Sequence, residues 1–213
     1  MRIFKSIMDI IRDFFKGESI EVKSEGEWKE GKKDGLWKTY YGDRKLKSVG
    51  NWKKGKKDGL WTNYHLNGRF SSKESWIEGK KDGLWTNYYN NDIHVDIPGN
   101  YGFLESEGNY KNDMKEGLWK LYYEITQHEY EWYLTSFFEN ITFDDVKGKL
   151  LVEGNWKEDK QEGVWSYYNQ KGQIKITGNW RKGIKEGSWI YYDDHGQLHK
   201  EEFMKNGNPE NTL

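Results

Sequence analysis

The stretch GKKDGLWTNY stands at residues 55–64 and recurs, letter for letter, at residues 79–88. An identical copy at an offset of 24 residues is typical of a repeat protein, in which each unit is one supersecondary element. The glycine after the Lys-Lys-Asp run marks the units. The intervals between these glycines are 24, 24, 34, 46 and 24 residues, so two units carry insertions of 10 and 22 residues. The marker positions are Gly35, Gly59, Gly83, Gly117, Gly163 and Gly187.

Aromatic residues keep fixed distances from this glycine in all six units. A Trp follows it by two residues, a Tyr follows it by five, and a Trp or Tyr precedes it by seven. A further half unit is recognisable at the end, with Leu198, Met204 in the place of Trp, and Gly207 in the turn. The sequence therefore predicts six and a half repeats within residues 18–213.

One unit, residues 46–65, predicts a β-hairpin, because two β-rich runs flank a Gly/Lys/Asp cluster. Gly55 and Gly59 bracket Lys56-Lys57-Asp58, where we expect the turn and positive φ angles. The Asn-Gly turn at 66–69 then leads to the next hairpin. We expect a mainly β fold: a single-layer, twisted antiparallel meander of hairpins with a solenoid-like shape. A parallel β-helix is disfavoured because each unit would need more corners.

Alternation along the strands sorts the side chains into two faces. A four-residue turn would place Trp52 opposite Trp61, with the nearby glycine leaving room for a neighbouring indole; a loop of three or five residues would swap the faces. Leu60, Thr62 and Tyr64 lie on the other face. The sequence thus predicts a Trp-lined face and a face striped with Tyr and Leu.

Helical periodicity is confined to two segments outside the repeats. Residues 1–17 carry Ile3, Phe4, Ile7, Met8, Ile11, Phe14 and Phe15 at helical spacing, which predicts an amphipathic helix that caps the sheet. Attachment to a membrane surface or to a partner helix are the alternatives. The insertion near 124–149 also predicts a helix, whereas the insertion near 90–103 predicts a loop.

Composition excludes several classes of protein and of site. Without Cys there is no disulfide, thiol nucleophile or zinc ribbon, and a net charge of −1 argues against nucleic acid as a partner. The charged residues in MRIFKSIMDIIRDFF exclude an ordinary signal peptide, so a cytoplasmic protein is expected. His195 and His199 straddle a predicted turn and do not form a metal pair. With no catalytic, cofactor or phosphate motif, we expect no enzyme activity, metal or cofactor.

The pattern G-x-W-x-x-G-K-x-D-G-x-W-x-x-Y-Y at residues 26–41 closely resembles the bacterial variant of the MORN repeat. The resemblance covers about residues 20–211. It implies hairpins stacked into an extended sheet, and bacterial members are often labelled antitoxin components of toxin–antitoxin systems. Eukaryotic relatives are linked to membranes, phospholipids and protein scaffolding. This sequence departs from the pattern at Glu74, which replaces Gly, at Tyr110, which replaces Trp, and in its two insertions.

These observations favour a protein-binding module, an antitoxin or immunity-type protein that masks a toxin. The alternative is a peripheral membrane or scaffold protein that uses the N-terminal helix and a basic rim. In later units the Lys pair of the rim is replaced by Lys115-Glu116, Gln161-Glu162 and Lys185-Glu186, and unpaired edge strands could form a homodimer. The candidate partner-binding residues are Tyr40, Tyr64, Tyr88, Tyr101, Phe103, Tyr130, Trp132, Tyr133 and Phe137, and the basic rim comprises Lys32, Lys33, Lys56, Lys57, Lys80 and Lys81.

Overall fold

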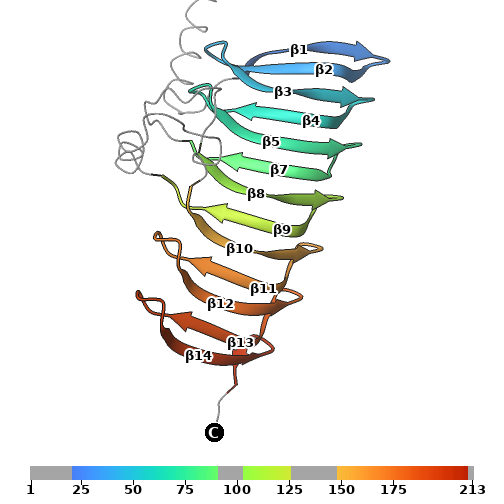
Figure 1. The fold of residues 1–213 in the computed structure, drawn as a ribbon. Helices are drawn as coiled ribbons and strands as arrows, with labels where there is room; N and C mark the ends of the chain where they lie inside the picture. Colours follow the sequence, from blue (N-terminus) through green and yellow to red (C-terminus); the bar gives the residue numbers. More distant parts are fainter. Residues whose placement is uncertain (1–20, 91–102, 126–147, 211–213) are drawn as a thin grey trace, which may run out of the picture.

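The computed structural model describes residues 21–90, 103–125 and 148–210, which form one antiparallel sheet and its connections (Figure 1). Neighbouring strands in the sheet are consecutive in the chain, apart from β6, which pairs only with β5. The strands are β1 (Glu21–Lys29), β2 (Lys32–Tyr41), β3 (Leu46–Lys53), β4 (Lys56–Tyr64), β5 (Phe70–Ile77), β6 (Lys80–Lys81), β7 (Gly83–Tyr88), β8 (Leu104–Lys111), β9 (Met114–Tyr122), β10 (Leu150–Lys157), β11 (Lys160–Tyr168), β12 (Ile174–Arg181), β13 (Ile184–Tyr192), β14 (Leu198–Lys205) and β15 (Asn208–Pro209).

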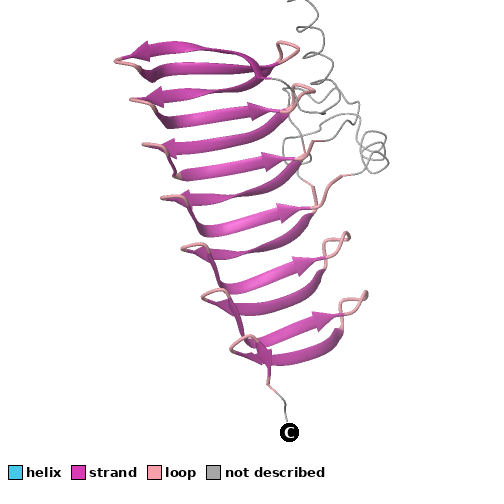
Figure 2. Ribbon diagram, turned by 180° about the vertical axis from the view of Figure 1, so that it is seen from behind, coloured by secondary structure: helices cyan, strands magenta, loops and turns pink. Residues whose placement is uncertain are grey.

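The predicted antiparallel meander is confirmed, and the parallel alternative is wrong, because every strand pair is antiparallel. The hairpins stack into a long, single-layer sheet, seen from behind in Figure 2. The described residues contain no helix. The predicted N-terminal helix and almost all of the two insertions lie outside the described residues, so those predictions stand as they were made.

The hairpin turn is displaced from its predicted position. Lys53 pairs with Lys56, which leaves a two-residue turn formed by Lys54 and Gly55, with φ angles of 50° and 81°. Two positive φ angles in a two-residue loop are the type I′ geometry, whose twist matches that of the flanking strands. Lys56 and Lys57 therefore begin β4 and do not form the turn.

Gly59 serves a bulge and not the turn. Gly50 pairs with Trp61 while Asn51 pairs with Asp58, so Gly59 and Leu60 are two extra residues relative to β3. Gly59 has a φ of 79°, a conformation that residues with a β-carbon rarely adopt. The bulge keeps the predicted faces: Trp61 lies on one face of the sheet, and Leu60 and Tyr64 lie on the other. We call these the Trp face and the Tyr face.

Adjacent hairpins are fastened at their turns by a carboxylate. Asp58 accepts a hydrogen bond from the backbone N–H of Glu78, in the turn of the next hairpin, at 3.2 Å. Asp34 accepts one from Lys54 at 3.0 Å, and Glu162 accepts one from Lys182 at 2.8 Å. The acid before each marker glycine thus satisfies a turn N–H one repeat away, which explains why this position is always Asp or Glu.

Both insertions replace turns that connect one hairpin to the next, at the strand ends opposite the hairpin turns. In an ordinary unit, the His65 N–H donates to the Arg69 carbonyl at 2.8 Å and closes the connection. The Tyr89 N–H donates to Phe103 at 2.9 Å, and the Tyr123 N–H donates to Lys149 at 2.8 Å, in the same way. The insertions therefore enter and leave the sheet without changing the pairing of the strands that flank them.

Candidate functional site

The Trp face is built from indole rings that lie on bare backbone. Trp61 is buried, and a β-carbon added to Gly50 would come within 2.2 Å of its ring. The Nε1–H of Trp61 donates to the Asn51 carbonyl at 3.0 Å, and Trp52 meets the ring edge-on at a centroid distance of 5.6 Å. The predicted contact between Trp52 and Trp61 is confirmed, although the residue directly opposite Trp52 is Lys57.

A lysine lies between the rings of successive hairpins. Lys57 Nζ is 4.2 Å from the centroid of Trp61 and 4.5 Å from that of Trp76 in the next hairpin. Such ammonium–ring contacts contribute about 0.5–1 kcal/mol each at exposed sites and more when desolvated. The second lysine of each predicted rim pair is therefore part of the Trp face, where it links two repeats. The lysines in this position are Lys33, Lys57, Lys81, Lys115 and Lys185.

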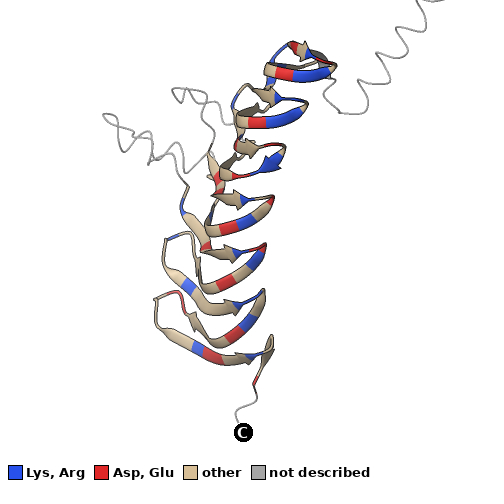
Figure 3. Cartoon of the chain, turned by 90° about the vertical axis from the view of Figure 1, so that its right-hand side faces the viewer, with Lys and Arg blue, Asp and Glu red and all other residues tan. Residues whose placement is uncertain are grey.

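This arrangement corrects the predicted alignment of the later units. Lys115 and Lys185 occupy the position of Lys33, and Gln161 is the one substitution among the six. Burial lowers the pKa of Lys115. The basic rim is thus reduced to the first lysine of each pair, and Lys32, Lys56 and Lys80 are exposed. Figure 3 shows that basic and acidic residues stand side by side along this edge.

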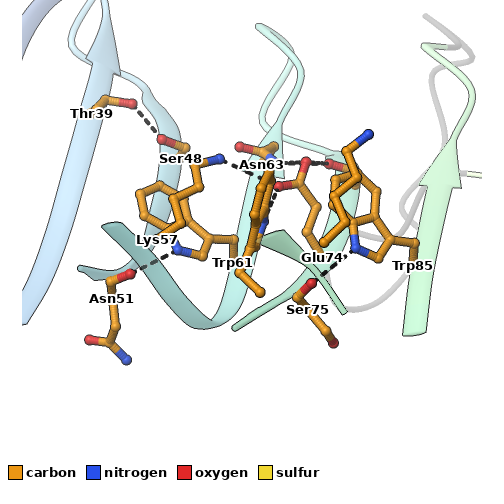
Figure 4. A network of polar contacts seen from close by, with 12 residues as sticks. Thr39, Ser48, Asn51, Lys57, Trp61, Asn63, Glu74, Ser75 and Trp85 are labelled. Atoms are coloured by element: carbon orange, nitrogen blue, oxygen red, sulfur yellow. Dashed lines mark hydrogen bonds and ion pairs between the residues drawn. The ribbon is translucent and has the colours of Figure 1, made fainter. Parts of the chain in front are cut away.

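Glu74 occupies the glycine position of the third unit and changes the Trp face there (Figure 4). Its Oε1 accepts hydrogen bonds from Asn63 at 2.7 Å and Ser72 at 2.9 Å, and its Oε2 accepts one from Trp76 Nε1 at 2.8 Å. Lys57 Nζ lies 3.5 Å away. Both oxygens of this half-buried carboxylate thus have partners, which offsets the cost of its desolvation. The rings of Trp76 and Trp85 are tilted here by 58°, whereas the other pairs meet at 77–87°.

One row on the Trp face changes its chemistry halfway along the sheet. In the first units it consists of cross-strand pairs of hydroxyl and amide groups, such as Thr39 with Ser48 at 2.6 Å and Asn87 with Ser106 at 2.9 Å. In the later units the same row is apolar. Its later members are Leu121, Val152, Tyr167, Ile176 and Tyr191. This change was not predicted from the sequence, because the row is defined by the register of the strands.

The Tyr face holds a compact aromatic and aliphatic cluster where the insertions leave the sheet. Tyr88, Leu104 and Tyr122 are buried against one another, with Phe70 and Leu150 packed beside them. A one-residue bulge turns the leucine position, which the sequence places on the Trp face, toward these tyrosines. Burial raises the pKa of Tyr122, and the hydrogen bond that its hydroxyl donates to Glu107 at 2.6 Å adds to this effect.

A second row on the Tyr face alternates exposed aliphatic side chains with Asn or Ser on the strands between them, as Leu36 lies opposite Asn51 and Leu60 opposite Ser75. Leu60 retains 75% of its accessible surface and Leu36 retains 55%. The row lies between the aromatic cluster and the hairpin turns, one member on every second strand. Its members are Leu36, Leu60, Leu84, Leu118 and Val164, with Ser188 in the same position of the sixth unit. We call this the leucine row.

The structure distributes the predicted partner-binding residues unevenly. Tyr40 and Tyr64 are half-buried on the Tyr face, whereas Tyr88 and Phe103 are buried and pack within the sheet. His65 has a packing role as well, with Nε2 3.0 Å from the Tyr88 carbonyl. The remaining predicted residues, Tyr101, Tyr130, Trp132, Tyr133 and Phe137, lie outside the described residues.

Within the described ranges, no group of three or more His, Asp or Glu side chains is placed to hold a metal ion. The same part of the chain contains no helix long and apolar enough to cross a membrane.

Comparison with protein families matches two stretches of this chain, residues 161–182 and 185–206, to the MORN repeat variant. Residues 161–206 are therefore similar to this repeat family. The matched stretches each run from the second strand of one hairpin through the first strand of the next, and the earlier units repeat the same Gly, Trp and Tyr positions. MORN repeats commonly serve as protein- or membrane-binding modules. A search of the curated proteins gave no match.

Proposed function

We propose that this chain is a non-catalytic protein-binding module, of the antitoxin or immunity type, that masks a partner protein. The observation that carries the proposal is the exposed leucine row, because five regularly spaced aliphatic side chains point into solvent from one face of the sheet. Regular exposed apolar residues on a repeat scaffold are typical of an interaction surface. The similarity of residues 161–206 to the MORN repeat variant agrees with a binding function.

We expect the two insertions to determine which partner this module binds. They are joined to neighbouring hairpins at one edge, through the same closing hydrogen bonds as ordinary turns. Insertions in repeat proteins often fall on the binding side, since they vary without disturbing the repeats. The buried cluster around Tyr88 and Tyr122 packs at the strand ends where the insertions join the sheet.

The test is a pull-down from the native host with the tagged full chain, after reversible cross-linking. We expect one protein to be recovered in stoichiometric amount and to co-elute with the purified chain. The matched control is a chain in which residues 90–102 and residues 124–148 are each replaced by the three residues 66–68 of the ordinary Asn-Gly turn. Repeated recovery of no stoichiometric partner by the full chain would contradict the proposal.

Membrane or scaffold attachment is the second candidate, and the exposure of Lys32, Lys56 and Lys80 at the hairpin turns favours it. Each basic residue near an anionic surface contributes about 1 kcal/mol. Flotation with vesicles that contain phosphatidylserine separates this candidate from the first. Flotation that survives both deletion of residues 1–16 and neutralisation of these lysines would contradict it.

A further inference from the structure

We propose that the leucine row and the lysines beside it form a docking site for an amphipathic α-helix with an acidic flank. The inference rests on the proposed protein-binding function and names the kind of segment that binds and the face that it meets. The site is centred on Leu36, Leu60 and Leu84, in the first three hairpins.

The spacing of the row selects a helix as the occupant. Members of the row are two strands apart, which is about 9.6 Å at the usual strand separation. A helix brings every seventh residue to the same side at a spacing of about 10.5 Å. In an extended strand, residues on one side recur at about 6.6 or 13 Å, so a strand running along the row misses its members. Three leucines span about 19 Å, which a helix of roughly 14 residues covers.

Lysines of the Tyr face lie within reach of the same helix. Trp52 is on the Trp face, so Lys53 and its cross-strand partner Lys56 point to the same side as Leu60. Asn51 lies in line with the leucine row, because it is directly opposite Leu36. Lys53 is two residues further along β3, so the Lys53–Lys56 pair lies about 7 Å from the row. A helix about 10 Å wide therefore covers both rows.

The charge of these lysines favours an acidic flank. Lys53 and Lys56 stand directly opposite each other, and like charges in this arrangement destabilise a sheet. The turn adds Lys54, while the acid of this hairpin, Asp58, is already bonded to the Glu78 N–H. No ion pair to Lys53 or Lys56 occurs within the described residues. A carboxylate on the bound helix would relieve the repulsion at this point.

A second copy of the chain is a poor occupant of this face. Two leucine rows brought together would set the lysine pairs of both copies against one another. A flat membrane would meet only part of the row, because the sheet twists along its length (Figure 3). A helix can follow the twist, since it touches the sheet along a single line.

The test uses the full chain and a synthetic helical peptide with Leu at every seventh position and Glu along one flank. Fluorescence anisotropy of the labelled peptide reports binding. The substitutions Leu36→Ser, Leu60→Ser and Leu84→Ser are combined in one variant, which should fold because Ser188 occupies the same position in the sixth unit. We expect at least tenfold weaker binding for this variant, and a comparable loss for Lys53→Ser combined with Lys56→Ser.

Three controls make the result decisive. A variant with Ile174→Ser and Leu198→Ser, both exposed elsewhere on the sheet, should bind within twofold of the unchanged chain. A peptide of the same composition in scrambled order and a peptide with Lys in place of Glu should bind at least tenfold more weakly. Equal binding of the three peptides, or unchanged binding by the triple-serine variant, would overturn the proposal.

Binding of phosphatidylserine vesicles that depends on the same leucines and lysines, without peptide binding, would also overturn it in favour of a membrane. If the peptide fails while the host pull-down still yields a partner, the docking site is wrong and the protein-binding function stands. The two proposals can therefore fail separately.

Discussion

Trp61 lies so close to the backbone of Gly50 that a β-carbon at position 50 would come within 2.2 Å of the indole. The same relationship joins Gly26 to Trp37, Gly154 to Trp165 and Gly178 to Trp189. Within residues 21–90, 103–125 and 148–210, no second layer covers the indoles of the sheet. The sheet buries them against glycine backbone, a neighbouring ring and a lysine from the same hairpin, so each repeat carries its own core.

Substitution of Gly50 by Ala is expected to lower the free energy of unfolding by about 1–3 kcal/mol, because the new methyl group overlaps the Trp61 ring. Urea unfolding followed by Trp fluorescence measures the loss. Lys53→Ala, at an exposed position three residues away, is the control and should change little. Equal stability of the Gly50→Ala variant and the unchanged chain would show that the indole can move aside.

Restoration of the missing cation should stabilise the fifth unit. Gln161→Lys would place an ammonium between Trp165 and Trp180, as Lys57 does between Trp61 and Trp76. We expect a gain of about 0.5–1 kcal/mol in the free energy of unfolding. Gln161→Met has a similar length but no charge and should give no such gain. If both variants are stabilised equally, side-chain packing and not charge links the rings.

Removal of the Glu74 carboxylate is expected to destabilise the third unit. Glu74→Ala would remove the carboxylate acceptor of Asn63, Ser72 and Trp76. Each of these donors that water does not reach would cost about 1–3 kcal/mol of stability. Thermal unfolding measures the effect. Glu202→Ala is the matched control, because Glu202 is at the same repeat position but near solvent, and its loss should be smaller. Equal losses of stability in the two variants would contradict this account, because they would show that the hydrogen bonds of Glu74 add no stability.

High pH should weaken the cluster around Tyr122. Its pKa is raised in the folded chain, so the neutral phenol is favoured there. The stability that this group contributes is present below about pH 10, the pKa of an unfolded Tyr, and is lost as pH rises further. Tyr122→Phe should therefore flatten the fall in melting temperature above that pH. Tyr192→Phe, at the same repeat position, is the control. The same pH dependence in the unchanged chain and the Tyr122→Phe variant would contradict this account.

The fold could be predicted from the repeated residues because each unit contains its own strand, turn and aromatic signals. The faces of the second strand of each hairpin could be predicted for the same reason, since alternation along β4 separates Trp61 from Leu60. The leucine that begins the first strand was expected on the Trp face, but a one-residue bulge places it on the Tyr face. The predicted position of the turn was wrong because two glycines flank the Lys-Lys-Asp run. Gly55 and Gly59 both have positive φ, but Gly55 forms the turn and Gly59 forms a bulge. Sequence patterns cannot distinguish these uses without knowledge of the register.

The role of the lysines was also beyond prediction from the sequence. Lys56 and Lys57 are adjacent and chemically identical, yet alternation sends one to solvent and the other between two indoles. The contacts of Lys57 join two hairpins, so they depend on strand register across the repeat boundary. The leucine row could have been found from the constant position after each marker glycine, but its exposure required the structure.

The central claim, that a partner protein binds the Tyr face through the leucine row, is tested most directly by hydroxyl-radical footprinting of the chain alone and in its complex. Leu60 and Trp28 are both exposed, at 75% and 64%, and Trp28 is aligned with the Trp face. We predict that labelling of Leu36, Leu60 and Leu84 falls in the complex while labelling of Trp28 is unchanged. Protection of Trp28 with unchanged labelling of the three leucines would contradict the account.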